Sequence, residues 1–141
     1  FRAGYSALRA RNIRVTVHLI DGLPGETAER MVESARTLGW LRPDGVKLHL
    51  LHVIRGTALC ALYERGDYVP LTREEYIDIV VRQLEVLPPE PVIERLTGDG
   101  DRRTLVAPLW SRDKRRVLGG IDKALAERDT WQGKLFEEGD A

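Results

Sequence analysis

The stretch from Val15 to Thr27, VTVHLIDGLPGET, constrains the fold most, because it reads as a strand, a tight turn and the start of a helix. Polar and apolar residues alternate along the strand up to Asp21, where the backbone must turn. Gly22 and Gly25 can adopt conformations closed to other residues, and Thr27 is a suitable N-cap. Corners of this kind at the C-terminal ends of parallel strands are where α/β folds place ligands.

The rest of the chain alternates predicted helices and strands. Thr72 and Glu75 have the spacing of a capping box, and two prolines stop that helix after Leu87. Gly39 is predicted to be the left-handed residue that ends the preceding helix, and Ser111 is a candidate N-cap of the last one. Helices are predicted over 27–38, 72–87 and 111–129, after the tail of a helix in 1–11; strands are predicted over 15–20, 46–53 and 92–96; 55–68 is a loop or short helix, and 104–110 is irregular or briefly extended.

This order of elements implies neighbouring parallel strands joined by helical crossovers. The strand interiors carry His18, Lys47, His49 and either Glu94 or Arg95, so one face of the sheet must meet something polar. We therefore predict an α/β fold, part of a (β/α) TIM-like barrel whose helices lie outside and whose inner face lines a cavity. A complete barrel needs about 250 residues, so three units make only a part, with open edges.

Composition excludes several classes of function. Lys plus Arg and Asp plus Glu both number 22, so no overall charge favours a nucleic acid or an anionic membrane surface. The sequence contains neither an apolar run of about 20 residues nor a signal-peptide pattern, so no membrane partner and a cytoplasmic location are expected. The single cysteine, Cys60, cannot form a disulfide framework or a self-contained metal site, and is expected to be a small buried residue.

Candidate chemical residues lie on the predicted inner face and at the strand ends. A lysine within a strand needs a partner, so Lys47 either pairs with Glu94 or binds a substrate anion. Each histidine alone is more often a hydrogen-bonded structural residue, and His49 and His52 are three apart on a predicted strand, which disfavours a histidine metal site. The basic runs at 102–103 and 112–116 contain or adjoin acidic residues, as on a solvated helix face.

Five phrases in the same order resemble the C-terminal half of radical S-adenosylmethionine (SAM) proteins of the YhcC type. These phrases are VHLIDGLPGET, VKLHLLHVIRGT, EEYIDIVVRQLEVLPPEPVIERLTGD, APLWSRDK and DTWQG, and they cover almost the whole chain. The resemblance implies a partial barrel of parallel β/α units, a [4Fe-4S] cluster held by a CxxxCxxC loop, and reductive cleavage of SAM to a 5′-deoxyadenosyl radical that acts on a substrate the sequence does not identify.

The CxxxCxxC loop does not occur in this sequence, and in the family it lies well upstream. The resemblance therefore implies that residues 1–133 are the C-terminal portion of a radical SAM barrel domain, that 134–141 are a frayed tail, and that the missing N-terminal half of the barrel is a partner. The cluster ligands would lie outside this chain, which alone is expected to be inactive.

The resemblance also implies roles for individual residues. Ile20 would pack on the adenine of the cofactor and Gly22 would let the backbone approach it. The glutamate of the general pattern GxIxGxxE falls at Gly25, one residue before Glu26. The implied cofactor contacts are His18, Ile20, Gly22, Leu23, Pro24, Gly25, Leu51 and His52, and the implied substrate contacts are Lys47, His49, Arg95 and Asp99.

Two other classes of function remain open from the residues alone. In one, a non-radical barrel enzyme binds a phosphate or carboxylate substrate at the GLPGET turn and uses His49 and Lys47 for acid–base chemistry. In the other, the chain is a non-enzymatic half-barrel that associates with itself or with another chain through its open sheet edges.

Overall fold

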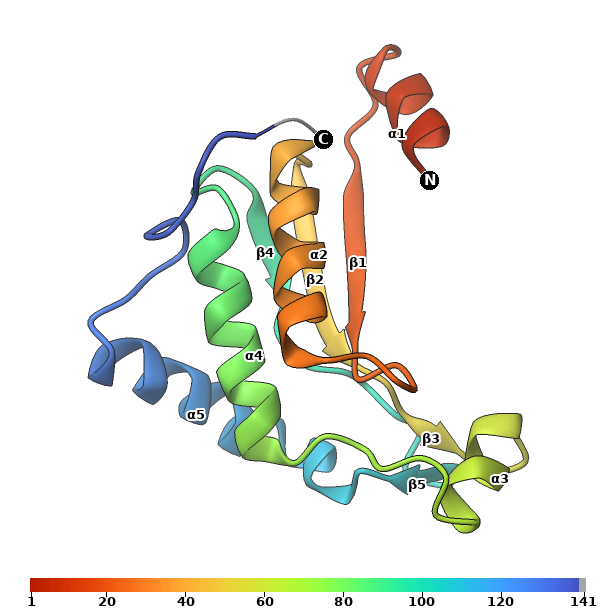
Figure 1. Cartoon of the computed structure of the whole chain (residues 1–141). Coiled ribbons are helices and arrows are strands. Elements are labelled where there is room, and N and C mark those ends of the chain that lie inside the picture. The colour runs from red at the N-terminus through yellow and green to blue at the C-terminus, as the bar shows by residue number, and fades with distance from the viewer. Residues whose placement is uncertain (140–141) are drawn as a thin grey trace.

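Three parallel strands form the central sheet of the computed structural model, which describes residues 1–139 (Figure 1). They are β1 (Thr16–Asp21), β2 (Gly45–Leu50) and β4 (Val92–Arg95), in the spatial order β1-β2-β4. The pairing of β1 with β2 is regular, whereas the pairing of β2 with β4 shifts after Val46. The C-terminal ends of all three strands therefore meet at one rim of the sheet.

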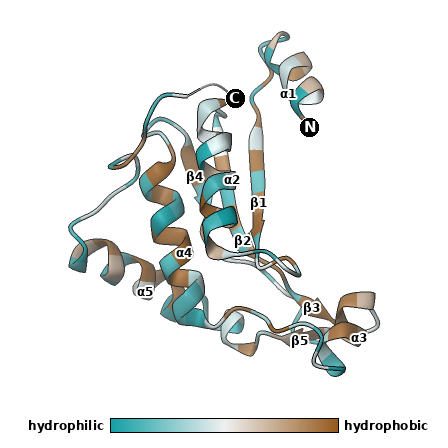
Figure 2. Cartoon of the chain, in the orientation of Figure 1, coloured by the Kyte–Doolittle hydropathy of each residue, from teal (hydrophilic) through white to brown (hydrophobic). Residues whose placement is uncertain are grey.

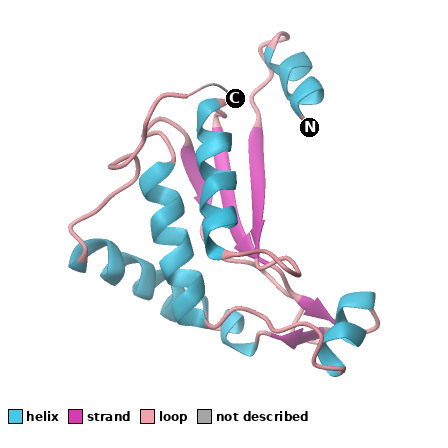
Figure 3. Ribbon diagram, in the orientation of Figure 1, coloured by secondary structure: helices cyan, strands magenta, loops and turns pink. Residues whose placement is uncertain are grey.

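Two helices, α2 (Ala28–Trp40) and α4 (Arg73–Val86), cover one face of this sheet, and α5 (Lys114–Glu127) packs against α4 (Figures 1 and 3). A short N-terminal helix, α1 (Arg2–Arg9), is attached by the Tyr5 hydroxyl, which donates to the carbonyl of Leu41 at 2.7 Å. The core lies between the sheet and the helices. Its most deeply buried members include Ala35, Val46, Leu48, Tyr76, Val80, Val81, Leu87, Val117 and Ile121.

A second, smaller unit lies beyond the rim of the main sheet. It contains an antiparallel pair, β3 (Val53–Ile54) with β5 (Leu105–Ala107), and the helix α3 (Ala58–Glu64). A separate apolar cluster of Val53, Cys60, Tyr68 and Ala107 holds it together. In Figure 1 this unit lies at the end of the sheet opposite the N-terminus. Thus the segment predicted as irregular or briefly extended contains a strand, and the short-helix alternative for 55–68 is confirmed.

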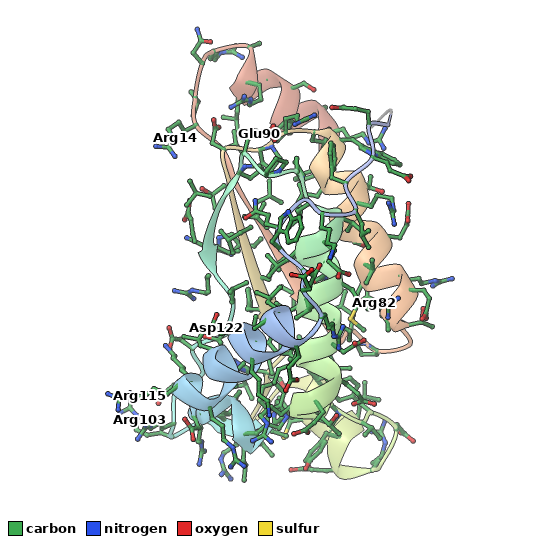
Figure 4. All side chains as sticks on the ribbon, turned by 90° about the vertical axis from the view of Figure 1, so that its left-hand side faces the viewer. Arg14, Arg82, Glu90, Arg103, Arg115 and Asp122 are labelled. Atoms are coloured by element: carbon green, nitrogen blue, oxygen red, sulfur yellow. The ribbon has the colours of Figure 1, made fainter. Side chains whose placement is uncertain are left out.

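The other face of the main sheet carries no helix among the described residues. Figure 4 shows the strands on one side and α2 and α4 on the other, and Figure 2 shows polar and apolar residues alternating along β1. Val17 and Leu48 point into the core, whereas His18 is exposed and His49 is half-buried. The predicted division of these strands into an apolar outer face and a polar inner face is confirmed.

Local capping follows the sequence in two places and departs from it in two. Thr27 accepts the amide of Arg30 at 3.3 Å, and Thr72 with Glu75 forms the predicted capping box. The prediction for Gly39 is wrong: it lies inside α2, where a Cβ would come within 2.8 Å of Pro88 Cδ. Close packing against the proline, and not a left-handed turn, explains the glycine.

The predicted cap at Ser111 is also wrong. Ser111 is buried in the 3-10 helix η1 (Leu109–Arg112), and its hydroxyl donates to the Pro108 carbonyl at 2.7 Å. Asp113 caps α5 instead, by accepting the amide of Arg116 at 3.1 Å. An aspartate is an equally good N-cap, so two candidates two residues apart could not be separated by type alone.

The C-terminal segment differs from the predicted frayed tail as far as residue 139. The Leu135 amide donates to the Glu85 carbonyl at 2.8 Å, and the Trp40 indole donates to the Glu137 carbonyl at 3.0 Å. Residues 140–141 of the predicted tail lie outside the described residues. Within residues 1–139, none of the helices has the length and apolar character that crossing a membrane requires.

Candidate functional site

The turn after β1 has the conformation that its glycines predict. Gly22 and Gly25 have φ angles of +88° and +76°, which L side chains rarely adopt. Two large apolar side chains flank this turn on the surface, Ile20 with 41% and Leu23 with 46% of its area exposed. An exposed apolar pair beside the exposed backbone of Gly25 suits a flat aromatic ligand better than a free phosphate, because a phosphate offers no apolar surface.

A tyrosine from the second unit holds this turn in place. The buried Tyr68 hydroxyl donates to the Gly22 carbonyl at 2.7 Å. Leu71 closes the other side, since its Cδ1 lies 3.2 Å from the position that a Cβ at Gly22 would occupy. The Trp110 indole in turn donates to the Leu71 carbonyl at 3.0 Å. Nothing in the sequence pattern of the loop around Tyr68 indicates this contact, which spans 46 positions.

A buried carboxyl lies directly under the turn, on the core side of the sheet. Asp21 is 2% exposed, and the Gln83 side-chain amide donates to its Oδ1 at 2.7 Å. Burial raises the pKa of Asp21 to about 7, against the hydrogen bond from Gln83, and the nearby Glu26 charge adds to the rise. Asp21 Oδ2 and Glu26 Oε2 are buried without a hydrogen-bond partner in the described part of the chain. Gln83 was not predicted from the sequence, although a polar residue on the apolar face of a predicted helix is a signal that could have indicated it.

His52 lies at the end of β2 beneath the loop that follows β4. A Cβ at Gly98 would lie 2.7 Å from His52 Cε1, and one at Gly100 would lie 3.2 Å from Nδ1, so only glycines let this loop pack on the ring. Burial, and secondarily the charge of His49, lowers the pKa of His52. Its Nε2 is buried and, among residues 1–139, has no hydrogen-bond partner. The loop therefore covers His52 and leaves one of its ring nitrogens buried and unpartnered.

The open face of the sheet has a closed polar network near the start of the strands. Glu94 accepts from the Thr16 hydroxyl at 2.7 Å, and its other carboxylate oxygen lies 3.3 Å from Lys47 Nζ. Gly45 makes this possible, because a Cβ there would lie 2.4 Å from Glu94 Oε1. Two roles are predicted for Lys47, pairing with Glu94 or binding a substrate anion, and the structure contains the ion pair with Glu94.

Further along the same face, the rings of His18 and His49 meet edge to face with their centroids 6.0 Å apart. Burial lowers the pKa of His49, a hydrogen bond to the Leu50 carbonyl opposes this, and the charges of His18 and Arg95 lower it further. Arg95 lies opposite Lys47 after the register shift. The ion pair of Lys47 with Glu94 forms the floor of this inner face. His18, His49 and Arg95 lie between this floor and the rim.

The structure brings most of the predicted contacts together along one path. Ile20 and the turn form the rim, His52 lies two residues after the end of β2 and beneath the loop after β4, and His18 and His49 lie on the open face. Leu51 differs, because its amide extends the β1–β2 ladder to the Asp21 carbonyl at 2.8 Å while its side chain packs on the second unit. Asp99 forms ion pairs with Lys114 and, at 3.8 Å, with Arg95.

A hollow of about 550 Å³ lies at the same rim of the sheet, between the loop after β4 and the first turn of α5. Arg102 and Arg115 line it and make no ion pair within residues 1–139, whereas Lys114 pairs with Asp99. In Figure 4, Arg103 and Arg115 project from the same end of the molecule. The predicted solvated basic face is therefore partly arranged around a hollow.

The donor set of this chain does not fit a [4Fe-4S] cluster. Cys60 is the one cysteine of the sequence; it is buried in the second unit, and its thiol donates to Glu64 Oε1 at 3.5 Å. Such clusters are held by several thiolates. The rim fits a nucleoside better, because it combines the exposed apolar side chains of Ile20 and Leu23 with the exposed, positive-φ Gly25.

Comparison with known proteins gives a family match and several relatives. Residues 43–127 match the family model described as the Radical_SAM C-terminal domain. The uncharacterized protein YtqA of Bacillus subtilis is 42% identical over 134 residues, covering 95% of this chain and 42% of that protein. Protein YhcC of Escherichia coli K12 is 33% identical over 126 residues, covering 84% of this chain and 38% of that protein. This chain thus spans about two fifths of these relatives.

A relative that covers less of the chain and a solved structure are also similar to it. A tRNA uridine(34) acetyltransferase of Methanocaldococcus jannaschii is 32% identical over 84 residues, covering 57% of this chain and 16% of that protein. The structure of Methanocaldococcus infernus Elp3 with an N-terminal deletion superposes with a TM-score of 0.74 at 22% identity, covering 93% of this chain and 32% of that one. At this identity the likeness concerns the fold alone.

Proposed function

The chain belongs to the radical SAM family, as a protein with the Radical_SAM C-terminal domain, and on this basis we propose that it is the C-terminal part of an iron–sulfur enzyme that binds SAM at the turn after β1. The expected relationship to YhcC-type proteins and the expected α/β fold class are both confirmed by the matches above. The enzyme's substrate and the role of each rim residue belong to the proposal.

The observation that carries this proposal is the rim itself. Ile20 and Leu23 offer apolar surface to an adenine, while the exposed Gly25, with nothing within 4 Å of its Cβ position, leaves the backbone open for close approach. Tyr68 and Leu71 keep that backbone in one conformation, so binding does not have to order it.

The cofactor's chemistry would come from outside this chain. When bound beside a reduced [4Fe-4S] cluster, SAM supplies a strongly oxidising carbon radical. The residues described here would bind and orient the nucleoside and present polar groups to a substrate below. The cluster ligands would lie upstream, so the gene encoding the whole protein should contain CxxxCxxC before Phe1.

The missing part of the barrel would lie against β1, which is an edge strand. A groove of about 560 Å³ follows that strand and the facing side of α2, and Val17, Leu19 and Leu38 contribute to its lining. We propose that the N-terminal half of the same protein covers this edge. The non-enzymatic alternative, self-association through the same edge, predicts instead a stable oligomer of this chain with no response to SAM.

A titration separates radical SAM function from a phosphate-binding barrel. Anaerobically reconstituted full-length protein is titrated by calorimetry with SAM and with glycerol 3-phosphate. Saturable binding of SAM alone supports the proposal, and binding of the phosphate ester alone contradicts it. Leu23→Ser should weaken SAM binding, because the variant loses apolar surface at the rim. Leu135→Ser, an equally exposed leucine in the C-terminal segment, is the matched control.

The hollow lined by Arg102 and Arg115 favours an RNA as the molecule that carries the group on which the enzyme acts. Unpaired guanidinium groups at the rim would bind phosphates, and one relative of this chain is named as a tRNA uridine(34) acetyltransferase. Arg115→Gln should weaken binding of a tRNA transcript and make it less salt-dependent. Arg36→Gln on α2 is the control, and equal effects of both changes would exclude an RNA site at this hollow.

A further inference from the structure

The inner face of the sheet carries more positive than negative charge near its centre. Its charged and titratable members are His18 on β1, Lys47 and His49 on β2, and Glu94 and Arg95 on β4. Glu94 and Arg95 both lie opposite Lys47, because the register shift after Val46 places two residues of β4 against one of β2. Glu94 is the one acidic residue among them.

Both oxygens of Glu94, the one carboxylate among these residues, already have a partner. Glu94 accepts from the Thr16 hydroxyl with one oxygen and pairs with Lys47 through the other. This neutralises Lys47, whose side chain is only 27% exposed, and gives the barrel a floor with balanced charge. Three groups above the floor, His18, His49 and Arg95, remain available to a ligand.

Arg95 keeps most of its hydrogen-bonding capacity. Its one ion-pair partner within the described residues is Asp99, whose Oδ2 lies 3.8 Å away, beyond hydrogen-bonding distance. Asp99 also forms a closer ion pair with Lys114 of α5. A guanidinium presents a planar fork of donors that matches the two oxygens of a carboxylate.

The two histidines lie on the neighbouring strands: His18 and Arg95 are both in register with Lys47, and His49 lies two residues further along β2. The two imidazole rings are 6.0 Å apart and nearly perpendicular. The repulsion of His49 by the charges of His18 and Arg95 would be relieved by an anion between them. A bound anion would therefore favour proton uptake by His49.

We propose that Arg95, His18 and His49 form a subsite for a carboxylate group of the substrate, an inference that rests on the radical SAM barrel proposed above. Arg95 binds both carboxylate oxygens, and the imidazoles donate from β1 and β2. A dianionic phosphate fits less well, because it would bring a second negative charge close to Glu94. The subsite places the carboxylate between the floor and the rim, with the rest of the substrate directed towards the turn after β1.

The test uses the 141-residue chain with ¹³C-labelled histidine and follows the Cε1 signals of His18 and His49 by NMR. The probes are acetate, inorganic phosphate and methylammonium at constant ionic strength and pH. We expect acetate to shift both signals saturably, more tightly at pH 6 than at pH 8. Methylammonium should shift neither signal. Unmoved histidine signals in acetate, or tighter binding of phosphate than of acetate, would overturn the proposal.

Substitutions identify the guanidinium. Arg95→Gln should weaken acetate binding about tenfold or more, the loss expected for a charged hydrogen-bonded partner, and Arg95→Lys should weaken it less. Arg103→Gln, on the exposed loop after β4, should leave it unchanged, and the amide spectrum of each variant verifies its fold. Equal acetate affinity of wild type and Arg95→Gln contradicts the subsite. If the protein binds acetate normally but fails to bind SAM, that result contradicts the proposed function and leaves the carboxylate subsite standing.

Discussion

The Tyr68 hydroxyl is the residue-scale contact that determines the shape of the rim. Tyr68→Phe leaves the buried Gly22 carbonyl without its donor, which should lower the free energy of unfolding by about 1–3 kcal/mol. The turn loses its fixed conformation as well, so SAM affinity should fall. Urea denaturation and SAM calorimetry measure the two effects. Tyr63→Phe, at a more exposed tyrosine on α3, is the control, and a Tyr68→Phe protein with unchanged SAM affinity would contradict the role assigned to this contact.

Asp21 predicts a dependence of stability on pH. Its folded-state pKa of about 7 lies above the ordinary aspartate pKa of 3.8, so its contribution to stability is full below pH 4 and is lost as pH rises to about 7. At about 1.4 kcal/mol for each pH unit, this loss is at most about 4 kcal/mol. Asp21→Asn removes the ionisation and keeps an acceptor for Gln83.

Urea denaturation at pH 4.5, 6 and 8 should therefore show Asp21→Asn gaining stability over wild type as pH rises, with no further gain above about pH 7. The exposed Asp122→Asn, labelled in Figure 4, is the control for a carboxylate on the surface. A difference between Asp21→Asn and wild type that stays constant with pH would show that Asp21 is ionised in the folded protein throughout this range.

For single residues, the sequence predicts that a side chain needs a partner better than it predicts which residue that partner is. Lys47 within a strand required a partner, and Glu94 could be named because both lie on predicted neighbouring strands. Tyr68, Gln83 and the glycines over His52 could not be assigned, because their contacts join segments that only the folded chain brings together. Residue spacing contains no information about such pairs.

At the scale of elements, Gly45 shows how a missing side chain determines the floor of the inner face. Gly45→Ala would place a Cβ 2.4 Å from Glu94 Oε1 and 2.9 Å from Thr16 Oγ1. The variant should displace Glu94 and separate it from Lys47, lowering the free energy of unfolding by roughly 1–3 kcal/mol, as overpacking usually does.

Gly119→Ala provides the matched control, because that glycine lies within α5 with no atom within 4 Å of its Cβ position. Alanine there should raise stability by roughly 0.5–1 kcal/mol through helix propensity. Thermal or urea denaturation of both variants gives the comparison. If Gly45→Ala is also neutral or stabilising, the ion-paired floor does not depend on the missing Cβ.

The main elements were predictable because their signals are periodic and local. The alternation along β1 and the capping box at Thr72 each specify an element without reference to the rest of the chain. The pair of β3 with β5 was not predictable, since two- and three-residue strands show no periodicity and their pairing joins distant segments. Gly39 was misassigned because packing and left-handed turns both select glycine.

At the scale of the whole molecule, the sheet has one face covered by helices and one face lined with polar groups. Its edge strand β1 borders a long groove, and this chain spans about two fifths of its relatives YtqA and YhcC. A three-stranded parallel sheet with an open polar face is poorly protected from water and from other edges. We therefore expect the remaining barrel strands to enclose the inner face and to complete the rim.

Formation of 5′-deoxyadenosine tests the central claim most directly. The full-length protein is reconstituted anaerobically with iron and sulfide, reduced, and incubated with SAM, and the nucleoside is quantified by liquid chromatography. We expect cluster absorption and 5′-deoxyadenosine from wild type, with less product from Leu23→Ser at limiting SAM and an unchanged yield from Leu135→Ser. A reconstituted protein that shows no cluster absorption, or that binds SAM at the rim and forms no 5′-deoxyadenosine, would contradict it.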